Sequence, residues 1–282
     1  MNLKERLTRI FQELQNAKNP ITKKGLDDVI FDCSMVITDD AVTDSLGKAL
    51  AHFLRGYAYL RRGENRTNPE SQDIENAVND FNRNLELTPS YYITYMYRAK
   101  AHFLQGHMQD AVNDATVAIE KGDGLLDARN IRANAYANLG EIEKAKRDFR
   151  KAIRLAPNNY GIYASRGLFY MRCKQYDNAI EDFTRAIQIN PSEAAYHEFL
   201  GRAYELNKDL INAEKMYKHA LALIDSIPNE QKNRFAYEIA IRCEKKLRDM
   251  EIDIVERYGE ISLQRGILTH QEIAKIKIGN VA

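Results

Sequence analysis

The sequence has few residues that interrupt helices and no long apolar segment. It contains only six prolines, no low-complexity tract and few runs of β-branched residues, so we predict an all-α protein. No stretch approaches the roughly 18 apolar residues that a membrane-spanning helix needs, so no membrane span is expected. Residues Met1 to Leu14 carry charges throughout and lack the apolar centre of a signal peptide, which favours a cytoplasmic location.

The sequence also lacks a strong charge bias and a cysteine framework. It has 41 Lys and Arg residues against 40 Asp and Glu residues, which offers no overall attraction to nucleic acid or acidic membranes. The three cysteines, Cys33, Cys173 and Cys243, are far apart and form no CxxC pair, which disfavours a disulfide framework and a zinc site. We expect buried free thiols in a reducing compartment.

What the sequence does contain is a pattern with a period of 34 residues. Its first member is an alanine, followed four residues later by Ala, Phe or Tyr and seven residues later by a second alanine: Ala111, Ala145, Ala179 and Ala213. Upstream, small residues and tyrosines keep the same spacing: Ala99, Ala133, Gly167 and Gly201, with Tyr136, Tyr170 and Tyr204. A fixed period of this length is typical of a chain built by stacking one unit.

Each unit is predicted to form two antiparallel helices. In one copy, Tyr163, Gly167 and Tyr170 share a face of the first helix, and Ala179 and Phe183 share a face of the second. Small residues let the two backbones approach, while the aromatic ring fills the space beside them.

An aromatic residue, a Gly or Ala, a Tyr, and then Ala, Phe, Ala and Pro at fixed offsets resemble the tetratricopeptide repeat (TPR). The resemblance implies a right-handed superhelix, an α-solenoid of antiparallel helix pairs with helical caps at both ends. Nine extra residues separate the helices of the first unit, and we expect them to form an exposed loop. Five TPR units are predicted within residues 49–227: 49–91, 92–125, 126–159, 160–193 and 194–227.

The flanking segments are predicted to cover the two ends of the array. Residues 1–48 would form a helical hairpin with an amphipathic first helix at 2–17, shielding the first apolar face. The alternative is a mobile helix that occupies the TPR groove until a partner displaces it. Residues 228–257 are predicted as a C-terminal capping helix and residues 258–282 as a small helical tail, which packs or, alternatively, binds a partner or nucleotide.

In TPR proteins the first helices of successive units line a concave groove. Residues expected to face it are apolar or aromatic early in the chain and polar later: Leu50, Phe53, Tyr57, Ile93, Met96, Lys100, Phe103, Asn130, Asn134, Arg172 and Arg202. Glu198 and Glu205 fall in the same register. An exposed apolar strip of this size would mark a binding site, unless a terminal helix already covers it. Asn130 and Asn134 lie one turn apart and could bind an extended peptide backbone. Alternatively, they could simply be polar side chains exposed to solvent.

Some TPR domains hold the acidic C-terminus of chaperones with a clamp of Lys, Asn and Arg. Read from the third unit, the matching positions lack the cationic pair: Asn130, Asn134, Ser165, Ala195 and Phe199. Chaperone-tail binding by that route is therefore not expected.

No catalytic or cofactor-binding motif is present, because a Gly-rich phosphate loop, HExxH and a nucleophile elbow are all absent. His52, His102 and His197 occupy repeat positions where other units carry aromatic residues, which favours packing over metal ligation. His102 and His107 are five residues apart and would not share a face of one helix. We expect no enzyme, no cofactor and no metal.

The sequence thus predicts a non-catalytic scaffold or adaptor that binds a peptide or helix of another protein in the concave groove. The alternative is a nucleic-acid- or nucleotide-responsive regulator that uses the C-terminal tail or the basic face of the third unit. That unit has eight Lys and Arg residues against four Asp and Glu residues. Nucleic-acid binding would need more net charge and an aromatic platform, so it is the second choice. Self-association stays open.

Overall fold

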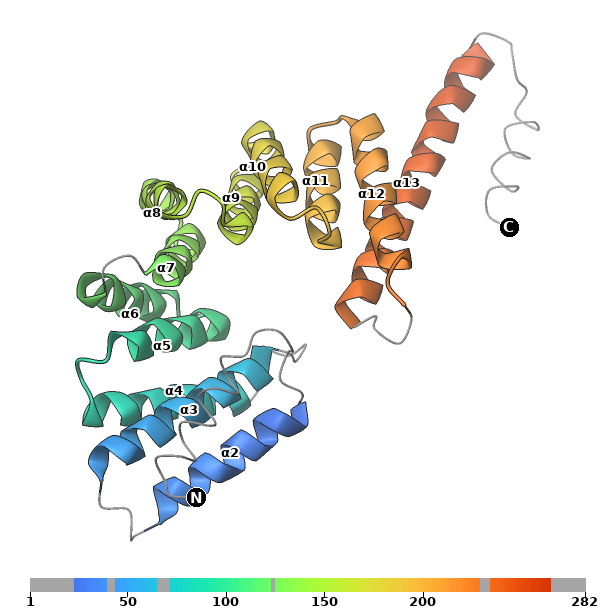
Figure 1. Cartoon of the computed structure of the whole chain (residues 1–282). Coiled ribbons are helices and arrows are strands. Elements are labelled where there is room, and N and C mark those ends of the chain that lie inside the picture. The colour runs from blue at the N-terminus through green and yellow to red at the C-terminus, as the bar shows by residue number, and fades with distance from the viewer. Residues whose placement is uncertain (1–22, 40–43, 65–71, 123–124, 229–233, 265–282) are drawn as a thin grey trace. The chain divides into compact units, whose positions relative to one another are not determined.

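In the computed structural model the described residues are helical and contain no strand, as the composition predicts. None of the helices in these ranges is long and apolar enough to cross a bilayer. The chain divides into two compact units, an N-terminal unit of residues 1–157 and a C-terminal unit of residues 158–282. The structure (Figure 1) describes the following ranges: 23–39, 44–64, 72–122, 125–228 and 234–264.

In the N-terminal unit each described helix packs against the next one in the sequence. The first helices of successive pairs also contact one another, α3 with α5 and α5 with α7. The helices are α2 (Lys23–Thr38), α3 (Ser45–Glu64), α4 (Gln72–Leu87), α5 (Tyr92–Gln105), α6 (Met108–Lys121), α7 (Leu126–Asn138) and α8 (Ile142–Leu155).

The C-terminal unit follows the same plan, with α9 contacting α11 and α11 contacting α13. Its helices are α9 (Tyr160–Arg172), α10 (Tyr176–Ile189), α11 (Ala194–Leu206), α12 (Leu210–Asp225) and α13 (Arg234–Gln264). Helix α13 runs as one helix past residue 257, where we expected a separate tail to begin. A glycine inside a helix costs only about 1 kcal/mol, so Gly259 does not end it.

Close packing inside the pairs explains the repeating small and aromatic residues. A Cβ atom added to Gly167 on α9 would lie 2.7 Å from Cε1 of Phe183 on α10. At Gly201 the same atom would lie 2.9 Å from the ring of Tyr217. Phe183 and Tyr217 are fully buried, so each ring fills the space that the missing side chain leaves. The predicted packing of small residues against rings is therefore confirmed at these two positions.

The turn from the first to the second helix of a pair also repeats. One residue of this turn has a positive φ, between 57° and 83°, at four positions spaced by the repeat: Gly106, Gly140, Lys174 and Lys208. The N–H of the next residue then donates to a carbonyl five residues back, as from His107 to His102 at 2.9 Å. Glycine adopts this left-handed conformation without strain, whereas lysine does so at a cost of about 1 kcal/mol. The second helix therefore starts in the same orientation in these four pairs.

A buried ion pair joins the two helices of four pairs. The guanidinium of Arg132 on α7 donates from Nε and Nη2 to the carboxylate of Asp148 on α8, at 2.7 and 2.8 Å. Equivalent two-point pairs link Arg55 to Asp80, Arg98 to Asp114 and Arg166 to Asp182. In the last pair the repeat places Leu200 and Met216 at these positions, where they pack in an apolar cluster.

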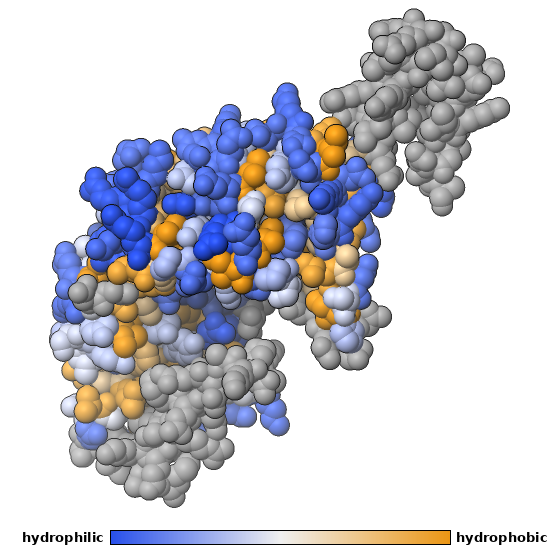
Figure 2. All heavy atoms as spheres, turned by 45° about the horizontal axis from the view of Figure 1, so that its top comes forward, coloured by the Kyte–Doolittle hydropathy of each residue, from blue (hydrophilic) through white to orange (hydrophobic). Residues whose placement is uncertain are grey.

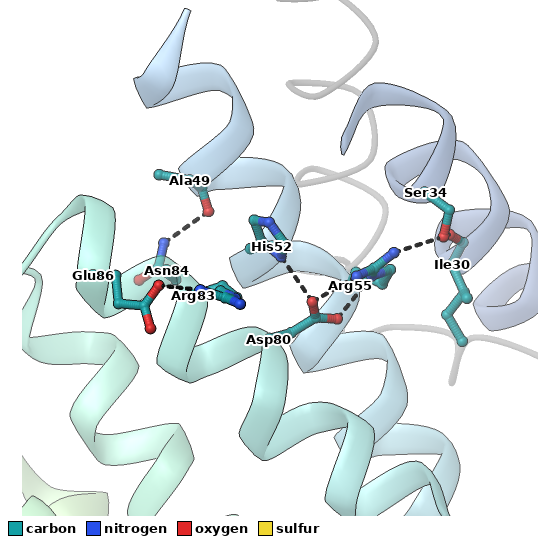
Figure 3. A network of polar contacts seen from close by, with 9 residues as sticks. All are labelled: Ile30, Ser34, Ala49, His52, Arg55, Asp80, Arg83, Asn84 and Glu86. Atoms are coloured by element: carbon teal, nitrogen blue, oxygen red, sulfur yellow. Dashed lines mark hydrogen bonds and ion pairs between the residues drawn. The ribbon is translucent and has the colours of Figure 1, made fainter. Parts of the chain in front are cut away.

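Three of these arginines also reach the preceding helix. Figure 3 shows Asp80 accepting from both His52 and Arg55, while Nη1 of Arg55 donates to the hydroxyl of Ser34 on α2 at 3.0 Å. Likewise, Arg98 donates to the side-chain oxygen of Asn82 on α4, and Arg132 to that of Thr116 on α6. Each of these arginines therefore holds three helices together.

Candidate binding face of the N-terminal unit

Helices α3, α5 and α7 carry the side chains that we expected to line a groove in this unit. The ring of Tyr57 on α3 meets the edge of Tyr97 on α5 at a centroid distance of 5.0 Å. The ammonium of Lys100 on α5 forms an ion pair with Glu64 on α3. Contact between α5 and α7 adds the side chains of α7, including Asn134. We call this surface the α3–α5–α7 face, defined by Tyr57, Arg61, Glu64, Tyr97, Lys100, Asn130 and Asn134.

The expected apolar strip is largely used by the core. Phe53 is only 4% exposed and Met96 only 8% exposed, so neither can serve as a surface anchor. The ring of Phe53 lies 5.4 Å from that of Tyr91 and 5.8 Å from that of Tyr97, both brought over it by the next helix pair. These contacts bury the side chain where the repeat register had placed it on the surface.

Three further apolar residues of the expected groove are half-buried. Leu50 and Ile93 pack against the core of the first repeats, and Phe103 packs beside Val112 on α6. On the side of the molecule drawn in Figure 2, hydrophobic residues also form separate patches among hydrophilic ones. The surface that remains on α3 and α5 is therefore aromatic and charged rather than a continuous apolar strip.

Two cations on this face share one carboxylate. Nη1 of Arg61 lies 3.5 Å from Glu64, which also pairs with Lys100. A second carboxylate, Asp127 on α7, also acts on the phenol of Tyr97, so the tyrosine rings lie among charges of both signs. Burial raises the pKa of Tyr97 to about 12, so its phenol keeps the proton at neutral pH and can donate a hydrogen bond.

The asparagines of α7 use part of their hydrogen-bonding capacity within their own helix. Nδ2 of Asn134 donates to the backbone oxygen of Asn130 at 2.9 Å, and Nδ2 of Asn138 donates to that of Asn134 at the same distance. A partner approaching Asn134 would therefore meet its carbonyl oxygen, which accepts an N–H.

In the C-terminal unit, the terminal helix α13 contacts the side chains of α11 that we expected to face the groove. Arg242 on α13 donates to both carboxylate oxygens of Glu198, at 2.6 and 2.8 Å, and Lys246 donates to Glu205 at 2.7 Å. Arg172 on α9 and Arg202 on α11 are exposed. A terminal helix therefore does cover expected groove residues on α11, because α13 binds both of these glutamates.

Sequence reasoning missed Arg61, Glu64 and Tyr97. Tyr97 is one residue beyond Met96, and its ring reaches the face by packing across α3 rather than through its own register position. Arg61 and Glu64 lie in the last turns of α3, whose length of 20 residues exceeds that of α5. An excess of helix length at the nine-residue insertion is the signal that could have drawn attention to them.

A family model described as the tetratricopeptide repeat matches residues 126–159 and 161–193, the segments of the pairs α7–α8 and α9–α10. The chain is therefore a protein that contains tetratricopeptide repeats. No curated protein sequence matches it significantly.

Solved structures share the fold. TTC0263, a thermophilic TPR protein of Thermus thermophilus, is 17% identical, with a TM-score of 0.57 over 71% of this chain and 98% of its own. The MamA RS-1 ArsTM double mutant is 19% identical, with a TM-score of 0.52 over 63% of this chain and 95% of its own. At these identities the likeness establishes the TPR solenoid fold alone.

Proposed function

We propose that the protein is a non-catalytic adaptor that binds a peptide or helical segment of a partner protein on the α3–α5–α7 face. The TPR fold supports a general role as a protein-interaction scaffold, because stacked helix pairs present an extended surface on their first helices. In the C-terminal unit, α13 already holds the glutamates of α11. The N-terminal unit is therefore the better candidate for the partner site.

The observation that supports this proposal is the combination of Tyr57 and Tyr97 with two cations that share Glu64. Tyrosine rings offer a rigid apolar surface with a polar edge, which suits a contact that is partly exposed to water. A partner carboxylate could pair with Arg61 or Lys100 without first removing a fully matched ion pair. We infer that the bound segment carries an apolar or aromatic residue next to an acidic one.

The contribution of the charges is modest and testable. Exposed ion pairs contribute roughly 0–1 kcal/mol each, so one lost cation on its own would weaken binding only several-fold. Reversing the charge also repels an acidic partner, which adds to the loss. We therefore expect Lys100→Glu to weaken partner capture by about tenfold or more.

The test is quantitative capture of interacting proteins from the source cells by the full chain, read by mass spectrometry. Lys100→Glu and Tyr57→Ala should both deplete the same partner, whereas Arg202→Glu on the C-terminal unit should not. Lys100→Glu and Arg202→Glu should melt close to the wild type, since both are surface side chains, whereas Tyr57→Ala loses the ring contact with Tyr97 and should melt slightly lower. If neither Lys100→Glu nor Tyr57→Ala changes partner capture, the α3–α5–α7 face is not the binding site.

The basic face of α8 motivates the alternative. Arg147, Arg150, Lys151 and Arg154 are exposed along this helix. Phosphate binding weakens steeply with salt because counterions are released, whereas apolar docking does not. Binding of a single-stranded oligonucleotide that is lost with rising salt and abolished in Arg150→Glu/Lys151→Glu would favour a nucleic-acid-responsive regulator instead.

A further inference from the structure

The turn between α5 and α6 brings two histidines together. Helix α5 ends at Gln105, and Gly106 adopts a φ of 83°. The chain then folds back, so that the backbone N–H of His107 donates to the carbonyl of His102 at 2.9 Å. The two imidazole rings lie 6.0 Å apart. The expectation that a spacing of five keeps these residues apart holds for a continuous helix and is wrong here, because the helix ends between them.

A carboxylate completes the cluster. Asp110 lies in the first turn of α6, one turn after His107. One ligand atom from each of His102, His107 and Asp110 lies within 4.8 Å of the other two. Two imidazole nitrogens and one carboxylate oxygen form a donor set that suits zinc and neighbouring divalent transition metals.

We propose that His102, His107 and Asp110 bind a divalent transition metal ion of the zinc class, with water as the fourth ligand. In a tetrahedral site with bonds of about 2.0–2.1 Å, ligand atoms lie roughly 3.3 Å apart. The three ligand atoms must therefore approach one another by at most about 1.5 Å. His107 and Asp110 are exposed and free to rotate toward the half-buried His102, so the backbone can stay in place.

His102 is prepared for this role. Among the described residues, no hydrogen-bond partner meets its buried Nδ1 atom. Its Nε2 atom lies 3.8 Å from the carboxylate of Asp114, which is itself held by Arg98. A carboxylate behind the imidazole is the usual means of orienting a histidine that binds metal.

The local charges allow a cation. The site lies where the C-terminal carbonyls of α5 meet the N-terminal amides of α6, so the two helix dipoles oppose each other there. Asp110 contributes a negative charge, and that of Asp114 is balanced by Arg98. A bound dication therefore meets one uncompensated carboxylate and two neutral imidazoles, a common charge balance for zinc with three protein ligands.

The experiment is calorimetric titration of the untagged full chain with zinc chloride, together with the visible absorption of the cobalt(II) form. We expect one ion per chain and the absorption bands of tetrahedral cobalt. His107→Asn and Asp110→Asn should each weaken zinc binding by at least about tenfold. His219→Asn, which changes an exposed histidine of the C-terminal unit, is the matched control and should leave the affinity unchanged.

Both test substitutions change exposed side chains, so the apo forms should melt at the wild-type temperature in chelator. Zinc should raise the melting temperature of the wild type and of His219→Asn, and the same zinc concentration should produce a clearly smaller rise in the other two variants. Absence of zinc binding would overturn the proposal. Equal affinity in the wild type and His107→Asn would overturn it too, since the ion would then lie elsewhere.

Discussion

Replacing Arg132 by leucine and Asp148 by methionine in one molecule should destabilise the protein far less than Arg132→Leu alone. The last helix pair already carries the apolar combination, Leu200 with Met216, at the equivalent positions. The chain therefore contains both solutions, an ion pair and an apolar pair, in the same structural setting.

The magnitudes follow from burial. The side chain of Asp148 is only 8% exposed, so Arg132→Leu strands a buried carboxylate at a cost of about 3–5 kcal/mol. Asp148→Met leaves Arg132 partly exposed, with its bond to Thr116 intact, and should cost about 1–3 kcal/mol. In the double variant no charge is stranded. The lost bond to Thr116 contributes about 1 kcal/mol, and new apolar packing offsets much of it.

Equilibrium urea unfolding of the full chain measures these values. The double variant should be less destabilised than the sum of the single variants by at least about 2 kcal/mol. The reciprocal pair offers a control, because Leu200→Arg should be severe and Met216→Asp added to it should restore part of the loss. Single effects that simply add, within about 0.5 kcal/mol, would refute the reasoning that a stranded buried charge dominates.

Three further substitutions test the packing and the pH response. Gly167→Ala should destabilise the protein by about 1–3 kcal/mol, because the new methyl group presses on the ring of Phe183. Gly161→Ala at the start of the same helix would place its Cβ atom 3.3 Å from Oδ1 of Asn159, a milder contact, so it should destabilise the protein clearly less than Gly167→Ala; equal losses in melting temperature would contradict this account. Burial lowers the pKa of His197, so the unfolded chain binds its proton more readily and stability should fall below about pH 6.5. His197→Tyr should reduce that fall in urea titrations at several pH values, with His219, stacked 5.8 Å away, left unchanged.

The helix pairs could be predicted because small and aromatic residues repeat with the period that stacking requires. Gly167 and Phe183 are informative in the sequence for the same reason that they touch in the structure. The ion pairs follow the same period at Arg98 and Arg132, so a search for repeating charges as well as apolar residues would have found them.

The surface could not be predicted in the same way. Phe53 is buried because the rings of Tyr91 and Tyr97, from the next helix pair, pack over it. The position of a residue in the repeat does not determine where such rings point. The cluster of His102 and His107 depends on one glycine turn that reverses the chain direction. Burial of this kind depends on contacts between different helix pairs, whereas the turn at Gly106 recurs with the repeat and could have been located from it.

The arginine bond to the preceding helix restricts how repeats from this chain could be recombined in engineered arrays. Arg98 needs an acceptor such as Asn82, and Arg132 finds one in Thr116. A second copy of residues 92–125 inserted after the first would present its arginine with Thr116 and should join smoothly. In a tandem copy of residues 126–159, the second copy of Arg132 would instead lie next to Arg150 of the first copy, at the position equivalent to Thr116. Arg150 offers no hydrogen-bond acceptor and carries the same charge. Residues 126–159 should therefore be poorly suited to tandem duplication, unless position 150 is changed to threonine.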